Sequence, residues 1–447
     1  MTPLSTCRRL IACLLMLPVW LPPCVAAEDA APAWRQRLHQ SYAEAGRAVA
    51  QWQAAAATEA ERDEAWRRAL QWQDLYRRYT ELQALLGQIE SRPGLADERL
   101  LYQARVEMGA GRHAQAARLL EPLRRRFVRL PDGELRQEVR LTLAALDLHL
   151  GQPEEATREL NRIVDGARDA GLPELAARAF SVLGEVQLEM FDYAAGLNYH
   201  RQALNLAPDW AVQTRERARM GMAQMINMVG DRREAFALLD TALAAFHRSQ
   251  NLRAEADALL LRGFFLHRDG KARQALEPYR QSLALREQLG GDADVINALT
   301  HLCSTLRDAR QLDEALSMCE RATRMAGAAD SETLRWDAHW VSAEAHAAAG
   351  DFQRAYEHQQ LATRALQKQS RLTLISMTGA MRERFDAERQ RLDNERLSVQ
   401  LSGEQGERER LRGVAWSLAA LALLLTAALG VSLRRRGQAS SNNVSAA

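Results

Sequence analysis

The sequence predicts an all-α protein, a right-handed superhelical solenoid of helix pairs with a period of about 40 residues. Three observations support this fold class. Hydrophobic residues make up 47% of the 447 residues, whereas glycine and proline number only 25 and 12, and this composition is typical of helices. A six-residue motif recurs at a nearly constant interval. After the last motif, no proline occurs and Gly379 is the one glycine before Gly403, so a further helical segment is expected.

Residues 1–27 have the pattern of a secretory signal peptide. Basic residues precede the apolar stretch 10–20, and the small residues of Val25–Ala27 match a cleavage site. A lipid attached to Cys24 is the alternative, although prolines precede this cysteine where small residues are expected. Export would place the mature chain in an oxidising compartment.

Residues 28–94 are predicted to form an N-terminal helical capping region. The segment lacks the repeated motif and is rich in aromatic residues, namely Trp34, Trp52, Trp66, Trp72, Tyr76 and Tyr79. A terminal element of a solenoid must cover the exposed end of the stack, which explains a large apolar content. An aromatic ligand site is the alternative interpretation.

Residues 95–370 are predicted to contain seven helix-pair repeats. Each motif begins with a residue suited to a left-handed turn, usually glycine, and a small residue follows five positions later. The motif occurs at Gly111–Ala116, Gly151–Ala156, Phe191–Gly196, Gly230–Ala235, Gly270–Ala275, Arg310–Ala315 and Gly350–Ala355. The spacing is 40 residues at five of the six steps and 39 at the other, which indicates one structural unit per copy.

A second small residue lies seven positions before each turn. These residues are Ala104, Ala144, Gly184, Ala223, Gly263, Cys303 and Ala343. Small residues on both helices let the two backbones approach. The pattern resembles the tetratricopeptide repeat, which has a small residue on the first helix, a glycine at the turn and an alanine on the second helix. The period exceeds that family's usual value of about 34, so longer helices or longer loops are expected.

The resemblance to the tetratricopeptide repeat implies a concave groove lined by the first helices. It places in this groove Arg105, Glu185, Gln224, Asn227, Phe264, His267, Arg307, Trp340 and Glu344. Mixed polar, charged and aromatic side chains suit an extended peptide or a partner's helix. The dicarboxylate clamp of chaperone-binding members needs several asparagines and lysines, whereas these positions include one asparagine and no lysine.

Cys303 and Cys319 are the cysteines that remain after residue 27. The first takes the small position on the first helix of the sixth repeat, and the second lies on the following helix, so both could point into the same layer. Either they form a disulfide within the helix pair, or they are small buried residues in tight positions.

The sequence contains no motif that predicts catalysis, a metal site or a cofactor. It has no HExxH or CxxC, no nucleophile elbow, no phosphate-binding loop and no dinucleotide fingerprint. His339 and His346 are seven residues apart and His358 follows, but no carboxylate cluster accompanies them. With 59 basic and 57 acidic residues, no nucleic-acid partner is expected either.

Residues 371–412 are predicted to form a helical stalk. Phe385, Leu392 and Val399 are spaced by seven residues, which is consistent with a weak coiled coil. A coiled coil would join two copies as a homodimer, whereas a single solvated helix would not.

Residues 413–433 are predicted to form a transmembrane helix, because 414–433 is a run of apolar residues without a charge. Three arginines open the short tail 434–447, and the positive-inside rule places this tail in the cytoplasm. The expected location is therefore the bacterial inner membrane, as a single-pass protein with a periplasmic bulk and a cytoplasmic C-terminus.

The order of signal peptide, repeats, stalk and span resembles the periplasmic sensor half of membrane-bound GGDEF proteins, the diguanylate cyclases. The segment Met381–Arg389 is similar to their stalk. In that family a cyclase domain follows the span, whereas here only 434–447 follow it. Gly290–Asp294 imitates the cyclase signature, but its place between two repeat helices predicts a loop.

The sequence thus predicts a non-enzymatic, membrane-anchored periplasmic receptor or scaffold that binds a protein or peptide. The alternative is the sensor half of a truncated or split GGDEF diguanylate cyclase or histidine-kinase signalling protein. In either case the sequence does not identify the ligand.

Overall fold

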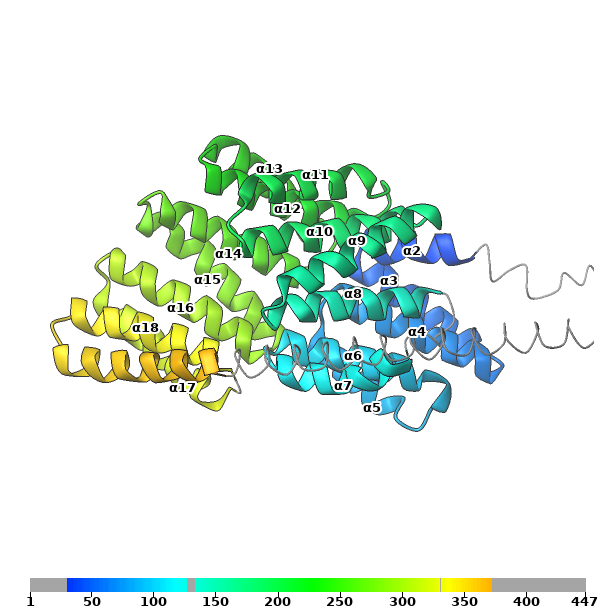
Figure 1. The fold of residues 1–447 in the computed structure, drawn as a ribbon, viewed down its shortest axis with the longest axis horizontal. Helices are drawn as coiled ribbons and strands as arrows, with labels where there is room; N and C mark the ends of the chain where they lie inside the picture. The colour runs from blue at the N-terminus through cyan, green and yellow to red at the C-terminus, as the bar shows by residue number, and fades with distance from the viewer. Residues whose placement is uncertain (1–29, 127–132, 330, 372–447) are drawn as a thin grey trace, which may run out of the picture. The chain divides into compact units, whose positions relative to one another are not determined.

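A computed structural model of the chain describes residues 30–126, 133–329 and 331–371. Within these residues all regular structure is helical (Figure 1), which confirms the predicted all-α class. The predicted signal peptide, the transmembrane segment, the tail and all of the stalk beyond residue 371 lie outside the described residues.

Four α-helices precede the repeats. They are α2 (Ala30–Gln40), α3 (Tyr42–Ala55), α4 (Glu59–Leu75) and α5 (Tyr79–Gln88), followed by the 3₁₀ turn η1 (Pro93–Leu95). Thr58 and Glu61 form a capping box at the start of α4. The aromatic side chains of this segment pack on one another. The Trp34 and Trp52 rings meet edge to face with centroids 5.0 Å apart, so these side chains build the segment's own core.

The repeats follow as helix pairs. The pairs are α6 (Ala96–Gly109) with α7 (His113–Arg126), α8 (Glu134–His149) with α9 (Pro153–Asp169), α10 (Pro173–Glu189) with α11 (Tyr193–Leu206), α12 (Val212–Val229) with α13 (Arg232–Arg248), α14 (Leu252–Arg268) with α15 (Ala272–Leu289), α16 (Asp292–Asp308) with α17 (Leu312–Ala328), and α18 (Glu332–Ala348) with the helical residues 352–371. Residues 290–291 connect α15 to α16. The segment Gly290–Asp294, predicted to be a loop, therefore contains a two-residue turn, and its last three residues form the start of α16.

The turn inside each pair has the left-handed conformation that the motif predicts. Gly111, Gly151, Gly230, Gly270 and Gly350 have φ between 74° and 114°. At the two copies without glycine, Phe191 and Arg310 have φ of 60° and 64°. A left-handed residue lets the chain reverse immediately after the first helix, so this part of the repeat prediction is confirmed.

The small residues bring the two helices of a pair close together. Ala104, Ala144 and Ala223 are fully buried. A Cβ built on Gly263 would lie 2.8 Å from the Tyr279 ring on the second helix, which is closer than real Cβ contacts. The second helices turn one apolar face toward this layer. In α9, for example, Leu160, Ile163 and Val164 are buried and the opposite face is exposed.

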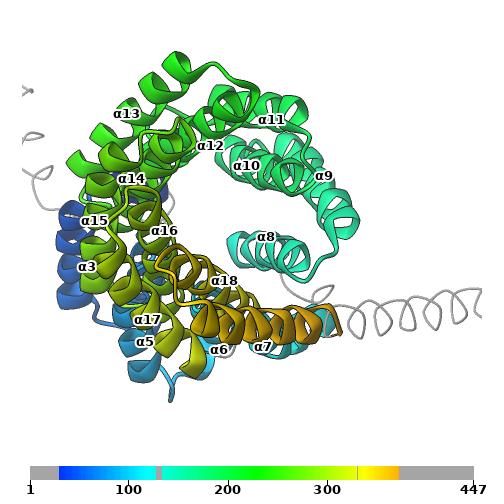
Figure 2. The same cartoon turned by 90° about the vertical axis from the view of Figure 1, so that its left-hand side faces the viewer.

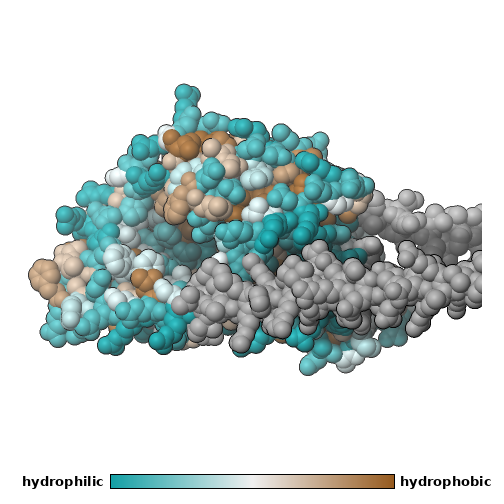
Figure 3. All heavy atoms as spheres, viewed as in Figure 1, coloured by the Kyte–Doolittle hydropathy of each residue, from teal (hydrophilic) through white to brown (hydrophobic). Residues whose placement is uncertain are grey.

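The helix pairs coil about a common axis. Figure 2 shows the first helices α8, α10, α16 and α18 on the inner side and the second helices α9, α11, α13 and α17 on the outer side. The face drawn in Figure 3 is mainly hydrophilic, with hydrophobic side chains gathered over α11 to α13. The first helices therefore form the inner layer of the coil, as the resemblance to the tetratricopeptide repeat implies.

The N-terminal helices contact repeats far along the chain. The backbone N–H of Tyr42 donates to the carbonyl of Ser249 over 2.9 Å, and the Thr80 hydroxyl donates to the carbonyl of Leu289 over 3.3 Å. Besides packing on α6, the segment thus bridges to the ends of α13 and α15. Side chains of this segment, among them Leu38, Asp74 and Tyr79, also line the inner space.

The predicted location as a single-pass inner-membrane protein is contradicted by the helices of the structure. None of the helices within the described residues is long and apolar enough to cross a bilayer. A span needs about 20 predominantly apolar residues, whereas α12, one of the longest helices here at 18 residues, carries charges at Arg215, Glu216, Arg217 and Arg219.

Candidate functional site

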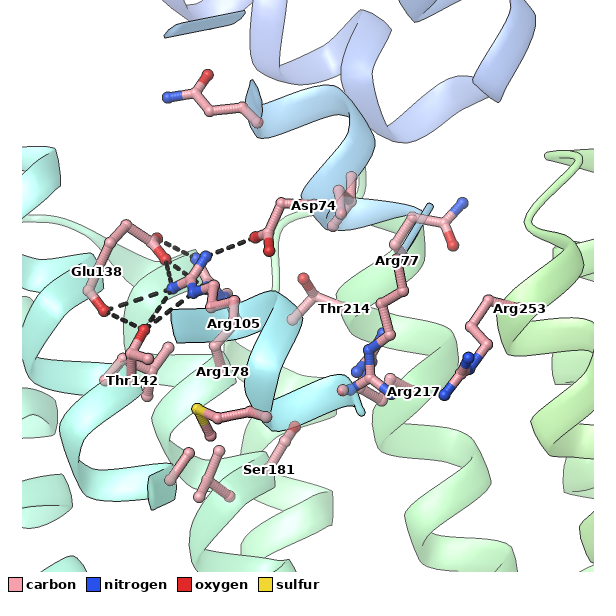
Figure 4. A pocket seen from close by; sticks show the side chains of 18 of the residues that line it. Asp74, Arg77, Arg105, Glu138, Thr142, Arg178, Ser181, Thr214, Arg217 and Arg253 are labelled. Atoms are coloured by element: carbon pink, nitrogen blue, oxygen red, sulfur yellow. Dashed lines mark hydrogen bonds and ion pairs between the residues drawn. The ribbon is translucent and has the colours of Figure 1, made fainter. Parts of the chain in front are cut away.

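A cavity of about 440 Å³ lies on the inner side of the helix pairs. Its lining comes from the first helices α6, α8, α10, α12 and α14, from the start of α16, and from α2, α4 and α5 of the N-terminal segment. Figure 4 shows that charged side chains from these helices project into it. The cavity is large enough for several residues of a peptide or for a small molecule.

One side of the cavity holds a carboxylate between two arginines. Arg178 Nη2 donates to Glu138 Oε2 over 2.8 Å, and Arg105 Nη2 donates to the same oxygen over 2.6 Å. Arg105 also reaches Thr142 Oγ1 at 2.9 Å and Asp74. Burial alone would raise the pKa of Glu138, but the two guanidiniums more than offset it and hold this pKa well below its usual range. This network fixes α6, α8 and α10 relative to α4.

The other side of the cavity gathers arginines from different helices. Figure 4 shows Arg77, Arg217 and Arg253 close together and directed into the same part of the cavity. Arg253 is buried and interacts with Asp257 at 3.8 Å and with Asp294. Its Nε and Nη1 atoms make no hydrogen bond. This side therefore presents N–H donors that the protein does not fully use.

Arg105 and Glu185 are the two predicted groove residues that line the cavity. Arg105 is held by the carboxylates of Asp74 and Glu138. Glu185 is exposed within the cavity wall. The resemblance to the repeat therefore pointed to the correct face of the first helices at these two positions.

Three predicted groove residues, His267, Arg307 and Glu344, come together outside this cavity, toward the C-terminal end of the repeats. Arg307 forms ion pairs with Glu344 and, at 2.9 Å, with Asp308. His267 Nε2 lies 2.7 Å from the second oxygen of Asp308. Trp340 is 39% exposed and lies beside Trp336 with ring centroids 6.0 Å apart.

Gln224, Asn227 and Phe264 do not line the cavity. Asn227 is buried and its Oδ1 accepts no hydrogen bond. Phe264 packs on the hydrophobic cluster around Phe265, with ring centroids 6.4 Å apart. The structure thus places Phe264 at the packing layer between helices rather than at the cavity wall.

The three histidines near the C-terminal end of the repeats approach one another. Nδ1 of His339 lies 3.0 Å from Nδ1 of His358, and the His346 ring stacks on His358 with centroids 5.3 Å apart. Burial, and then the two neighbouring imidazoles, lower the pKa of His358. Among the described residues, no group of three or more His, Cys, Asp or Glu is placed to hold a metal ion.

Cys303 and Cys319 are paired as a disulfide between α16 and α17, with their Cα atoms 5.4 Å apart. This separation lies in the usual range for disulfides. Both side chains are buried beside Ala345, so the bond lies inside the packing layer between the sixth and seventh repeats and away from the cavity.

Sequence reasoning missed most of the charged residues of the cavity. The signal that could have found several of them is the residue six positions before each small residue of the first helix. It is charged in six copies and asparagine in the other, namely Glu98, Glu138, Arg178, Arg217, Asp257, Asn297 and Asp337. A charged residue repeated at one helical position marks an inner face that is not filled by apolar packing. Arg77 carries no such signal, because it precedes the repeats.

Comparisons with known proteins concern the fold. No family model matches the chain, and no curated protein matches it. The structure of the APC/C heterotetramer Cut9–Hcn1 is similar, with 11% identity, a TM-score of 0.52, and coverage of 74% of this chain and 59% of that chain. At this identity the likeness shows the fold alone.

Two further structures are less similar. A Rap protein complexed with competence and sporulation factor has 14% identity and a TM-score of 0.45, with 69% and 99% of the two chains covered. A signal-transduction ATPase with a tetratricopeptide repeat sensor from Pyrococcus horikoshii has 12% identity and a TM-score of 0.47, with 76% and 54% covered. These likenesses support no argument about function, and none supports the resemblance to GGDEF sensors. The chain has a tetratricopeptide-like helical repeat fold.

Proposed function

We propose that the chain is a non-enzymatic receptor that binds a peptide segment in the cavity of about 440 Å³. One observation carries the proposal: the first helices of successive repeats and the N-terminal helices together line a half-open cavity that the protein's own side chains do not fill. A concave site of this size, lined from several helices, is typical of ligand pockets.

The chemistry of the lining favours a peptide over a purely apolar ligand. The cavity is lined by the apolar side chains of Leu75, Met108 and Leu141 together with arginines, carboxylates and the hydroxyl of Thr214. A peptide presents apolar side chains, charges and amide groups within a few residues, so it can use all three kinds of partner. The cavity wall holds carboxylates as well as guanidiniums, and this mixture disfavours a polyanion such as nucleic acid.

Ser181, a hydroxyl in the cavity wall, donates to the carbonyl of Ala177 on its own helix over 3.2 Å. Within the described residues this hydroxyl forms no hydrogen bond with a basic side chain, and the proposal includes no catalytic step. The resemblance of the sequence to signalling sensors remains a prediction, and peptide binding does not depend on it.

The proposal is tested with a mixed tetrapeptide pool and the purified full-length chain. Peptides retained by wild type are measured by mass spectrometry after gel filtration. Val182→Trp places a large ring in the cavity wall and should abolish retention. Val229→Trp is the matched control, because Val229 is 61% exposed and lies outside the cavity lining. Absence of retention by wild type, or equal retention by Val182→Trp with an unchanged melting temperature, would contradict the proposal.

A further inference from the structure

Two guanidiniums of like charge approach each other in the cavity. Arg77 comes from the turn between α4 and α5, and Arg217 comes from α12, 140 positions later. Figure 4 shows the two side chains converging. The nearby charge of Arg77, followed by burial, lowers the pKa of Arg217 to about 10, so the residue remains a cation at neutral pH.

The carboxylates around this pair are shared by other arginines. Arg286 is buried and donates to Asp257 over 2.7 Å and to Asp294 over 3.0 Å. Arg253 interacts with the same two carboxylates. Arg77 reaches Asp257 only at 3.7 Å.

Arg217 is the surplus cation of this cluster. It makes no hydrogen bond and no ion pair with any residue that the structure describes. Glu185 also lies in the cavity wall, but it is exposed and forms no ion pair with Arg77 or Arg217. Arg253, which is 5% exposed, keeps two N–H groups without an acceptor beside this position. Unused donors in a partly buried place cost free energy unless a ligand accepts them.

The backbone at Arg77 also has an unusual conformation. Its φ is 50°, in the left-handed region that favours glycine. The turn is closed by hydrogen bonds from the N–H of Arg77 to Asp74 and from the N–H of Arg78 to Gln73, each over 2.9 Å. An arginine in this place directs a long cationic side chain into the cavity at a cost to the turn.

We propose that Arg77 and Arg217, with the free N–H groups of Arg253, form an anion subsite that takes a carboxylate of the bound peptide. This inference rests on the proposed peptide-binding function. Guanidiniums bind carboxylates through paired, charge-assisted hydrogen bonds. One carboxylate between the two arginines would neutralise their repulsion. The source of the carboxylate is either the C-terminus of the peptide or an Asp or Glu side chain.

The first test needs no ligand. Removing the charge in Arg217→Gln relieves the repulsion from Arg77, so the melting temperature of the full-length chain should rise by about 2–4 °C. Arg217→Lys keeps the charge and should give no rise. Arg201→Gln is the matched control, because Arg201 is exposed on α11. A melting temperature that falls in Arg217→Gln but not in Arg217→Lys would mean that an internal carboxylate already pairs with Arg217, and it would overturn the inference.

The second test compares tetrapeptide pools in three forms. One pool has free C-terminal carboxylates, one has C-terminal amides, and one has amides and lacks Asp and Glu. Wild type should retain the first pool at least about tenfold more than the third, which corresponds to one charge-assisted contact. Arg217→Gln should remove this preference, and Arg201→Gln should keep it. The second pool distinguishes the sources: retention equal to the first assigns the carboxylate to a side chain, and retention equal to the third assigns it to the C-terminus.

The outcomes separate this inference from the proposed function. If wild type retains all three pools equally, peptide binding stands and the anion subsite is wrong. If wild type retains none of them, the proposed function fails, and the subsite fails with it.

Discussion

The imidazole of His200 occupies the space beside Gly184, where a Cβ would lie 2.7 Å from Cδ2 of the ring. His200 is on α11 and Gly184 is on α10, so the glycine lets the second helix of this repeat carry a ring at this position, as Gly263 does for the Tyr279 ring in a later repeat. Gly221 on α12 faces the same ring, with a built Cβ 2.5 Å from Nδ1. The small residues Gly184 and Gly221 therefore leave room for the His200 side chain from the neighbouring helix α11.

Gly184→Ala should destabilise the fold. The added methyl must displace the His200 ring or separate α10 from α11, and such overpacking costs about 1–3 kcal/mol. The midpoint of urea unfolding should fall. Gly166→Ala is the control, because Gly166 lies in α9 with nothing within 4 Å of a built Cβ, and removing a helical glycine should raise stability by about 0.5–1 kcal/mol. Equal effects of the two substitutions would contradict this packing.

Stability should fall as the pH drops from about 6.5 to about 4. Burial lowers the pKa of His200 from 6.5 to about 4, and burial together with neighbouring cationic groups does the same for His113 and His301. Between these values the unfolded chain binds protons that the folded chain does not, so the folded state loses stability in this window and keeps it above pH 6.5.

The measurement for this pH dependence is the melting temperature from pH 7.5 to pH 4. His200→Gln should flatten part of the decline, because one group contributes at most about 1.4 kcal/mol per pH unit. A wild-type melting temperature that does not change over this window would show that the folded protein protonates these histidines as readily as the unfolded chain does, and it would contradict the lowered pKa values.

Phe191→Gly and Arg310→Gly should each stabilise the protein by about 0.5–1 kcal/mol. Both residues have a left-handed backbone, with φ of 60° and 64°, which costs a non-glycine residue about 1–2 kcal/mol. Both side chains are exposed, so little packing is lost. Gly151→Ala, at the matching turn, should have the opposite sign. Thermal unfolding that shows losses at all three positions would contradict the interpretation of these turns.

Reduction of the Cys303–Cys319 bond should lower the melting temperature. The two residues are 16 positions apart, and a loop of about 15 residues corresponds to about 3 kcal/mol in the chain-entropy model. Cys319→Ser should lower stability by a similar amount and become insensitive to reductant. Two titratable thiols in unfolded, unreduced protein would show that the cysteines only fill space.

Trp340→Ala should change the free energy of unfolding little, because the side chain is 39% exposed. Phe265→Ala is the contrasting variant: this ring is fully buried, and its loss should cost about 3–5 kcal/mol. If Trp340 belongs to a partner surface, pull-down of a bound protein should weaken in the first variant at an unchanged melting temperature. A large drop in stability would place Trp340 in the core.

The sequence by itself determined the repeat. The left-handed turns at Gly111 and Gly350, and the close helix pairs at Ala104 and Ala223, depend on contacts within one repeat. Such contacts follow from backbone sterics and from side-chain size, both of which can be read from residue type at a fixed spacing. The all-α class follows from the same local preferences.

Only the tertiary structure decided where the cavity lies and which charges meet in it. Thr80 contacts Leu289 across 209 positions, and Arg77 meets Arg217 because the coil returns the later repeats to the N-terminal helices. The curvature of a solenoid is the sum of small rotations between neighbouring repeats. No single interface between repeats fixes the total curvature, and a residue type that recurs at one position of the repeat does not predict it. Long-range pairs such as Arg77 and Arg217 therefore become visible only when all the repeats are assembled.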